Sequence, residues 1–90
     1  MKKLIKIFKT LSNEKRLKII LALKQGPMYV GQIASLLNIS LKATSTHLKI
    51  LDGADLIRKE KRGNLVFYTL ARFPQESLRR RIVEMLENIR

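Results

Sequence analysis

The segment from Ser40 to Leu51, SLKATSTHLKIL, constrains the fold more than any other part of this 90-residue chain. Ser40 is a favourable N-cap residue, and positions 41, 44, 48 and 51 are apolar or small and share one face at helical spacing. The opposite face is short, polar and free of carboxylates; it carries Lys42, Ser45, Thr46 and Lys49. Such a helix suits the major groove of DNA, but the segment alone fits an ordinary amphipathic surface helix equally well.

The charge of the chain indicates a polyanionic partner. Nineteen Lys and Arg against seven Asp and Glu leave a net charge of +12, which favours nucleic acid or an anionic membrane surface. Residues 1–24 are the most basic part, with eight cations and one acid. The absence of cysteine excludes disulfides and thiolate metal sites.

The N-terminal residues 2–11 are predicted to form a basic amphipathic helix. Such a helix can lie on a membrane, but the next helix follows so closely that we favour packing on the domain or on a second subunit. Lys6 and Lys9 interrupt the apolar run that a signal peptide needs, and no run approaches the roughly 18 apolar residues of a spanning helix. We therefore expect a cytoplasmic protein without a membrane partner.

The segments before Ser40 predict a helix-turn-helix. Ser12 or Asn13 caps a second helix, which Leu17, Ile20, Leu21 and Leu23 or Lys24 continue and whose apolar surface Ile19 widens. Gln25-Gly26-Pro27 ends it, and residues 28–30 favour a short edge strand. A compact helix over 31–37 and a tight turn over 38–40 then lead into the helix that begins at Ser40.

The segments after that helix predict a hairpin and a last helix. The runs 56–62 and 65–70 have strand character on either side of Gly63-Asn64, a two-residue hairpin signal. The hairpin tip is basic, as in a wing, and an amphipathic helix over 75–90 follows Pro74. The expected fold is mainly α with a small β-hairpin wing, a winged helix-turn-helix in the order α-α-α-α-β-β-α with one extra short strand, in a single domain of residues 1–90.

Three segments resemble the ArsR-type (ArsR/SmtB-like) winged-helix transcriptional repressors: LSNEKRLKIILAL, IASLLNISLKATSTHLKIL and ADLIRKEKRGNLVFYTL. Together they cover just over half of the chain in the order and spacing of the family. The resemblance implies a homodimer that binds double-stranded DNA through two recognition helices and two wings. The DNA-contacting residues that it implies are Ser40, Lys42, Ser45, Thr46, His47, Lys49, Lys59, Lys61, Arg62 and Asn64. The implied dimer-interface residues are Leu4, Ile7, Phe8, Leu11, Leu78, Ile82, Met85 and Ile89.

The chain departs from the family pattern at three points. Many relatives have Arg at the position of Thr46, so a bidentate guanine contact is missing there, and Asp55 replaces the Gly that normally follows the recognition helix. The Cys pairs and the Asp and His pairs of metal-responsive relatives are also absent. Glu84 and Glu87 fit a solvated face better than a metal site, so we expect no metal and no cofactor.

These features predict a sequence-specific regulator of transcription, a repressor that binds a near-palindromic operator as a homodimer. One alternative is a non-specific architectural nucleic-acid-binding protein, which the basic residues 1–24 support. Another is a protein-interaction adaptor built on the same fold. An enzyme is not expected, because the single His47 has no nucleophile or acid at informative spacing and there is no Gly-rich phosphate loop.

Overall fold

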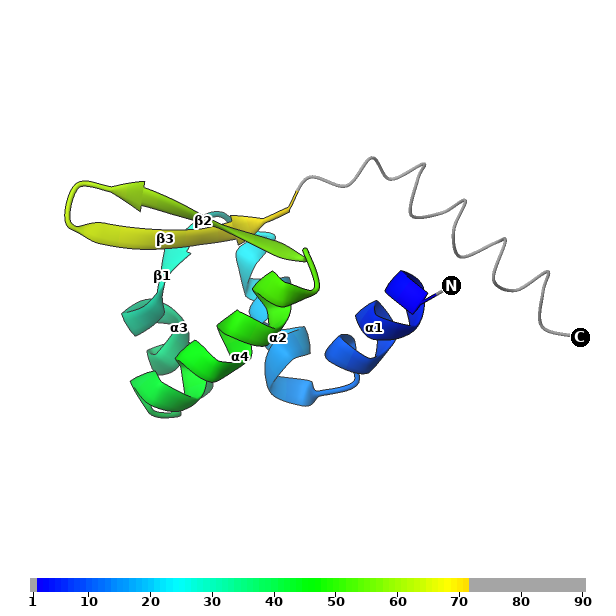
Figure 1. The fold of residues 1–90 in the computed structure, drawn as a ribbon. Coiled ribbons are helices and arrows are strands. Elements are labelled where there is room, and N and C mark those ends of the chain that lie inside the picture. Colours follow the sequence, from blue (N-terminus) through cyan, green and yellow to red (C-terminus); the bar gives the residue numbers. More distant parts are fainter. Residues whose placement is uncertain (1, 72–90) are drawn as a thin grey trace, which may run out of the picture.

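The computed structural model describes residues 2–71, which form four helices and three strands (Figure 1). The elements are α1 (Lys2–Leu11), α2 (Glu14–Leu23), β1 (Met28–Tyr29), α3 (Val30–Leu37), α4 (Leu41–Gly53), β2 (Ile57–Arg62) and β3 (Leu65–Leu70). This order confirms the predicted winged helix-turn-helix, including the extra strand near residue 28. The helix expected over 75–90 lies outside the described residues.

Local sequence signals explain where the helices begin and end. The Asn13 side chain accepts a hydrogen bond from the Arg16 backbone N–H at 3.1 Å, so Asn13 rather than Ser12 is the N-cap of α2. Asn38 ends α3 in the left-handed conformation with φ 55°, a conformation that Asn tolerates better than most residues. Asp55 has φ 59° after α4, so the Asp that replaces the family's Gly still makes the left-handed exit.

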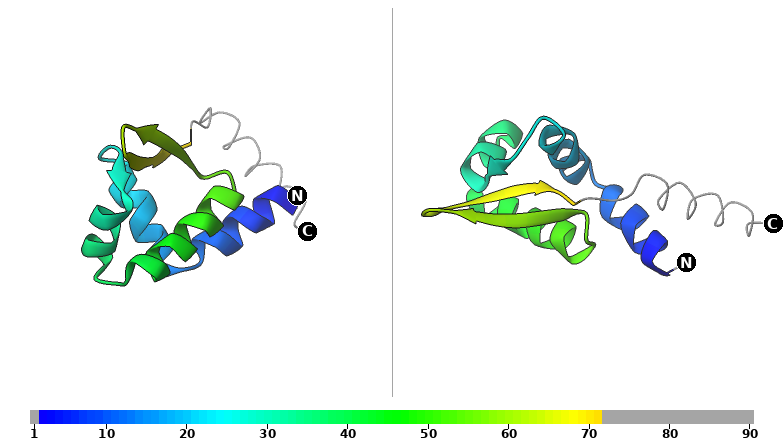
Figure 2. Two further views of the ribbon diagram at one scale, coloured as in Figure 1. Left: turned by 60° about the vertical axis from the view of Figure 1, so that its left-hand side comes forward. Right: turned by 90° about the horizontal axis from the view of Figure 1, so that it is seen from above.

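The three strands form one antiparallel sheet in the order β1-β3-β2, with β1 at an edge as predicted. Arg62 pairs with Leu65, which leaves Gly63 and Asn64 as a two-residue loop. Gly63 has φ 60° and Asn64 does not, the pattern of a type II′ turn, whose twist matches that of the flanking strands. The hairpin reaches past α3 and is free of the helices at its tip (Figure 2).

The core lies between the helices and the inner face of the sheet. It contains Ile19, Leu23, Ile33, Leu37, Leu48, Leu51 and Ile57. Of the apolar residues expected to continue α2, Leu17 and Leu21 are exposed, whereas Ile19, expected only to widen the apolar surface, is fully buried. Amphipathic spacing alone could not decide between these faces, because α2 has apolar residues on nearly every side.

The apolar stripe of α4 is one turn shorter than predicted. Thr44, Leu48 and Leu51 are buried, but Leu41 is 58% exposed. The buried Thr44 hydroxyl donates to the Ser40 carbonyl at 2.8 Å, so its polarity is satisfied. Leu41 is the first residue of α4. Helical periodicity shows which residues share a face, but it does not show whether the elements packed against that face reach the first turn of the helix.

Among the described helices, α1 packs mainly against α2 and reaches the C-terminal end of α4 (Figure 2). Leu4, Ile7 and Thr10 are buried, and the Lys6 ammonium donates to the Gly53 carbonyl at 2.9 Å. A cation at the carbonyl end of α4 is favourably placed toward the helix dipole. None of the helices within residues 2–71 is long and apolar enough to cross a membrane.

Candidate nucleic-acid interface

One face of α4 presents polar and basic side chains to solvent, as predicted. The residues exposed there are Lys42, Ser45, Thr46 and Lys49. They lie opposite the buried Leu48 and Thr44, so the core holds this face outward. No carboxylate lies among these four residues, and the first one along the helix is Asp52, about one turn beyond Lys49. The short side chains of Ser45 and Thr46 allow close approach of a DNA groove.

Thr46 turns its hydroxyl back onto its own helix. The hydroxyl donates to the Lys42 carbonyl at 3.1 Å, a common arrangement for an exposed helical Thr. The methyl group and the remaining lone pairs are therefore what Thr46 offers to a ligand. A methyl group suits contact with the C5-methyl of thymine better than a hydrogen bond to guanine.

Ser40 has a structural role besides its predicted place in the groove. Its hydroxyl oxygen accepts a hydrogen bond from the Ala43 backbone N–H at 3.0 Å and caps α4. The helix N-terminus also carries partial positive charge, which favours a phosphate or an acidic cap. The side chain therefore stabilises the helix whether or not DNA is bound.

Replacement of the cap separates these two roles. We expect Ser40→Ala to lower the free energy of unfolding by about 0.5–2 kcal/mol and Ser40→Asp to preserve stability, because Asp caps as well as Ser. Ser40→Asp should nevertheless weaken DNA binding, since it adds a negative charge beside the groove. Urea unfolding and DNA titration of the two variants measure both effects. Equal DNA affinity of Ser40→Asp and the wild type would remove Ser40 from the interface.

His47 lies on the flank of α4 rather than at the centre of its exposed face. The ring is half-buried, and its Nδ1 lies 3.4 Å from the Arg16 guanidinium Nη1 on α2. Burial lowers the pKa of His47 below its usual value, and the nearby cations Arg16 and Lys15 lower it further. Sequence reasoning missed Arg16, because a residue 31 positions earlier gives no periodic signal of this contact.

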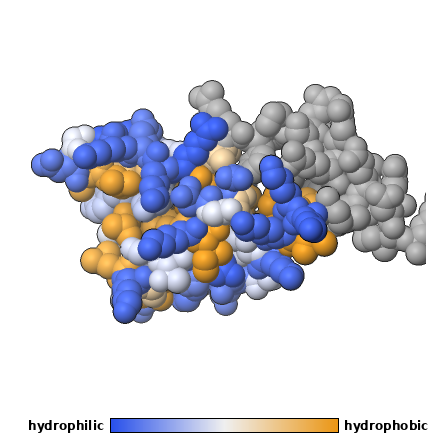
Figure 3. Space-filling view, viewed as in Figure 1, coloured by the Kyte–Doolittle hydropathy of each residue, from blue (hydrophilic) through white to orange (hydrophobic). Residues whose placement is uncertain are grey.

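The hairpin residues predicted to contact DNA are all exposed: Lys59, Lys61, Arg62 and Asn64. Hydrophilic residues cover most of the visible hairpin tip (Figure 3). Strand register divides the cations between the two faces of the hairpin. Lys59 and Lys61 pair with Tyr68 and Val66, on the face where Ile57 joins the core. Arg62 lies on the other face.

Arg62 is held by its neighbours on the hairpin. Its guanidinium lies 3.1 Å from the Glu60 carboxylate and stacks 5.1 Å from the centre of the Phe67 ring. Phe67 in turn packs edge-on against Tyr29, with ring centres 5.9 Å apart. Because Glu60 partly neutralises Arg62, this residue offers less charge to a phosphate than Lys59 or Lys61 does.

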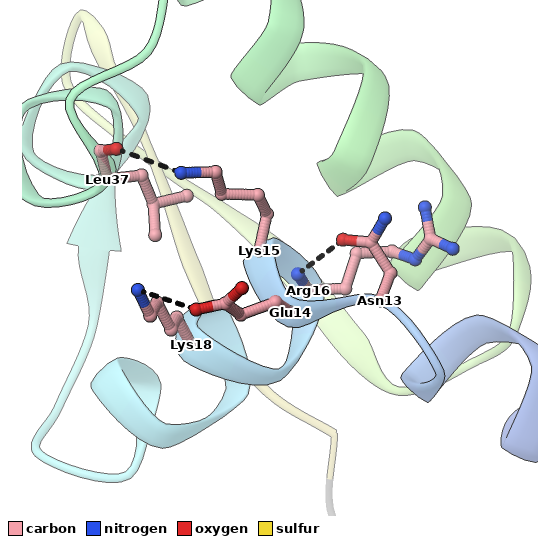
Figure 4. Close-up of polar contacts among 6 residues, drawn as sticks. All are labelled: Asn13, Glu14, Lys15, Arg16, Lys18 and Leu37. Carbon is pink, nitrogen blue, oxygen red and sulfur yellow. Dashed lines mark hydrogen bonds and ion pairs between the residues drawn. The ribbon is translucent and has the colours of Figure 1, made fainter.

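Within residues 2–71, polar contacts hold four of the cations of the basic N-terminal region. Figure 4 shows the Lys18 ammonium 3.2 Å from the Glu14 carboxylate and the Lys15 ammonium donating to the Leu37 carbonyl at 3.5 Å. Lys6 and Arg16 donate to the carbonyls of Gly53 and Thr10. The Glu14 carboxylate offsets the charge of Lys18, whereas the carbonyl acceptors orient Lys6, Lys15 and Arg16 and leave their charges unchanged. The charge of this region therefore does not by itself decide between specific and non-specific binding.

The predicted dimer-interface residues of α1 have different surroundings. Leu4 and Ile7 are buried, Leu11 packs against the core, and Phe8 is 45% exposed beside the exposed Ile5. Of the predicted α1 set, Phe8 therefore offers the most surface to a second subunit. The other four predicted residues, Leu78, Ile82, Met85 and Ile89, lie outside the described residues, as do Glu84 and Glu87. Within residues 2–71, no three acidic or His side chains come together as metal ligands.

Comparison with known proteins identifies the family. Residues 13–59 match the model of the bacterial regulatory proteins of the arsR family. The transcriptional repressor SdpR of Bacillus subtilis (strain 168) is 41% identical over 64 residues, which cover 71% of this chain and 71% of SdpR. The transcriptional activator HlyU of Vibrio cholerae is 36% identical over 69 residues, 77% of this chain but only 64% of HlyU.

Solved structures give the same assignment. Reduced HlyU from Vibrio cholerae N16961 superposes with a TM-score of 0.75 at 30% identity, over 92% of this chain and 87% of that chain. The homodimeric winged helix-turn-helix DNA-binding domain of Mb0332 from Mycobacterium bovis gives a TM-score of 0.76 at 25% identity, over 99% of this chain and 83% of that one. The matched segment contains all of α2, α3 and α4, and so the chain belongs to the ArsR family of bacterial transcription regulators.

Proposed function

We propose that this protein is a cytoplasmic, sequence-specific double-stranded DNA-binding repressor that acts as a homodimer, with residues 1–90 as one DNA-binding domain. The observation that carries the proposal is the exposed face of α4, where Lys42 and Lys49 flank Ser45 and Thr46 and no carboxylate intervenes. The lysines bind phosphates and set the affinity, whereas Ser45 and Thr46 meet base edges and set the preference.

A homodimer gives this interface its symmetry. Two recognition helices related by a two-fold axis meet half-sites roughly 34 Å apart, so the operator is near-palindromic. The homodimeric state of the Mb0332 domain supports this arrangement. Repression rather than activation is supported by SdpR, although HlyU is named an activator. Transcription in vitro from a bound promoter should fall as protein is added, and a rise would instead make the protein an activator.

Competition between DNA fragments tests the proposal. Selection of binding sites from genomic fragments should yield a near-palindrome that unrelated duplex fails to displace, with a preference of about 10³ or more. Equal competition by unrelated duplex would favour the architectural alternative. No affinity for any duplex at moderate salt would favour the protein-interaction adaptor.

Substitutions on α4 should separate affinity from preference. Thr46→Val keeps a methyl group and loses only the hydroxyl, so we expect it to retain the base preference; Thr46→Ser loses the methyl group and should relax the preference by about 1–3 kcal/mol at one base pair. Lys49→Ala should weaken binding to all sequences alike. Affinities for the operator and for its single-base variants measure the pattern. A uniform loss in Thr46→Ser would contradict the groove assignment.

A further inference from the structure

Arg16 joins three helices at one point. Its backbone N–H is bound by the Asn13 cap, which begins α2. Its guanidinium Nε donates to the Thr10 carbonyl, near the end of α1, at 2.6 Å, and Nη1 lies 3.4 Å from His47 Nδ1 on α4. One side chain therefore links α1 and α4, which are separated in the sequence by α2, β1 and α3.

The contact with His47 specifies the state of the imidazole. Arg is a donor only, so His47 Nδ1 must carry no proton and accept, with the ring proton on Nε2. The charged side chains that face the ring are Arg16 and Lys15, both on α2, while α1 contributes the uncharged Thr10 behind Arg16. Protonation of His47 would remove the acceptor and place a third positive charge beside two others.

We propose that Arg16 is a positioning residue for DNA recognition: by binding the Thr10 carbonyl and His47 together, it sets the orientation of the recognition helix α4 against α1. The inference rests on the proposed function. His47 then acts through Arg16 and is not itself a phosphate contact. Lys6 of α1 donates directly to the Gly53 carbonyl at the C-terminal end of α4, so α1 and α4 are linked twice, once directly and once through Arg16 of α2.

The arrangement links the two predicted interfaces of the protein. Helix α1 carries the exposed Phe8 of the predicted dimer surface, and α4 carries the groove-facing residues. A rigid link between them makes the orientation of each recognition helix depend on the dimer axis. Operator affinity, which requires both half-sites to be met at once, depends on this orientation more than non-specific affinity does.

The pH dependence of DNA preference distinguishes positioning from direct contact. We expect the ratio of operator affinity to unrelated-duplex affinity to fall by about five- to tenfold as the pH drops from about 7.5 to about 5.5, because protonated His47 loses Arg16. A direct phosphate contact gives a different result: a protonated imidazole binds phosphate more tightly in both complexes, so both affinities rise and their ratio stays constant. His47→Asn keeps an acceptor oxygen near the place of Nδ1 and does not titrate, so its ratio should stay constant. A wild-type ratio that stays constant or rises at low pH would overturn the proposal.

Substitution of Arg16 provides the second arm. Arg16→Met should reduce the ratio of operator affinity to unrelated-duplex affinity by about five- to tenfold at neutral pH. Lys18→Met removes one charge from the same helix and should leave this ratio unchanged. Arg16→Met combined with His47→Ala should cost no more than Arg16→Met alone, because each change removes the Arg16–His47 contact on which the effect of His47 depends. Additive losses would show that the two residues act independently and would overturn the link.

A measurement without DNA keeps this inference separate from the proposed function. Followed by NMR, the His47 pKa should rise in Arg16→Met and stay constant in Lys18→Met, because removal of the nearby guanidinium favours the charged imidazole. An unchanged His47 titration in Arg16→Met would overturn the inference even if the wild type prefers an operator. Conversely, a wild type without operator preference at neutral pH would overturn the proposed function, while the His47 titration still reports on the contact.

Circular dichroism at each pH provides the control for folding. The pKa of His47 is lower in the folded chain than in the unfolded chain, so the unfolded state binds more protons and stability falls as the pH drops through about 6.5. Only ratios measured where the protein remains folded enter the comparison.

Discussion

Raising the salt concentration from 50 to 200 mM is expected to weaken the operator complex by about 10³–10⁵, as for proteins that make 6–10 phosphate contacts. Helix α4 exposes Lys42 and Lys49, and the hairpin face that also carries Ile57 exposes Lys59 and Lys61. Four per protomer correspond to about eight in a homodimer, within that range. Arg62 is left out of this count because Glu60 already pairs with it.

Titration of labelled operator at several salt concentrations measures the effect. The slope of log affinity against log salt should decrease in magnitude by about two for Lys49→Ala, one contact for each protomer. Lys18→Ala removes the same charge from α2, where Lys18 pairs with Glu14, and should leave the slope unchanged. A complex insensitive to salt would contradict binding through phosphates.

Replacement of Leu51 by Ala is expected to lower the free energy of unfolding by about 2–5 kcal/mol. Leu51 has 0% exposure in the core formed by the helices and Ile57, so its truncation removes buried apolar contacts and leaves a cavity. A domain of this size has only about 5–15 kcal/mol to lose, so the change should be visible as a large drop in the unfolding midpoint.

Leu41→Ala on the same helix is the matched control. Leu41 is 58% exposed, and surface substitutions usually change stability by less than about 0.5 kcal/mol. Urea unfolding of both variants gives the comparison directly. Equal destabilisation would mean that the stripe of α4 begins at Leu41, as helical periodicity alone predicts, and would contradict the burial in the structure.

Much of the fold follows from local chemistry and was predictable. The caps at Asn13 and Ser40 and the stops at Gly26 and Gly63 act on neighbouring residues, and each lies where a short-range signal placed it. The exposed face of α4 was predictable for the same reason, since the 3.6-residue period sets which side chains share a face. The roles of these residues in DNA binding remain predictions.

The surroundings of individual side chains required the tertiary structure. The sequence could not show that Leu17 and Leu21 of α2 face solvent while Ile19 is buried, because that depends on where other helices pack. Likewise, strand register rather than strand propensity places Lys59 and Lys61 on one hairpin face and Arg62 on the other.

The sequence by itself determined the order of the elements, their limits and the polar face of the recognition helix, because these depend on residues within about one turn of one another. Only the tertiary structure showed that His47 contacts Arg16 and lies on the flank of α4, away from the centre of the polar face. The two residues lie 31 positions apart, and their contact results from the packing of α2, α3 and α4 on a shared core. Contacts of that range carry no period in the sequence.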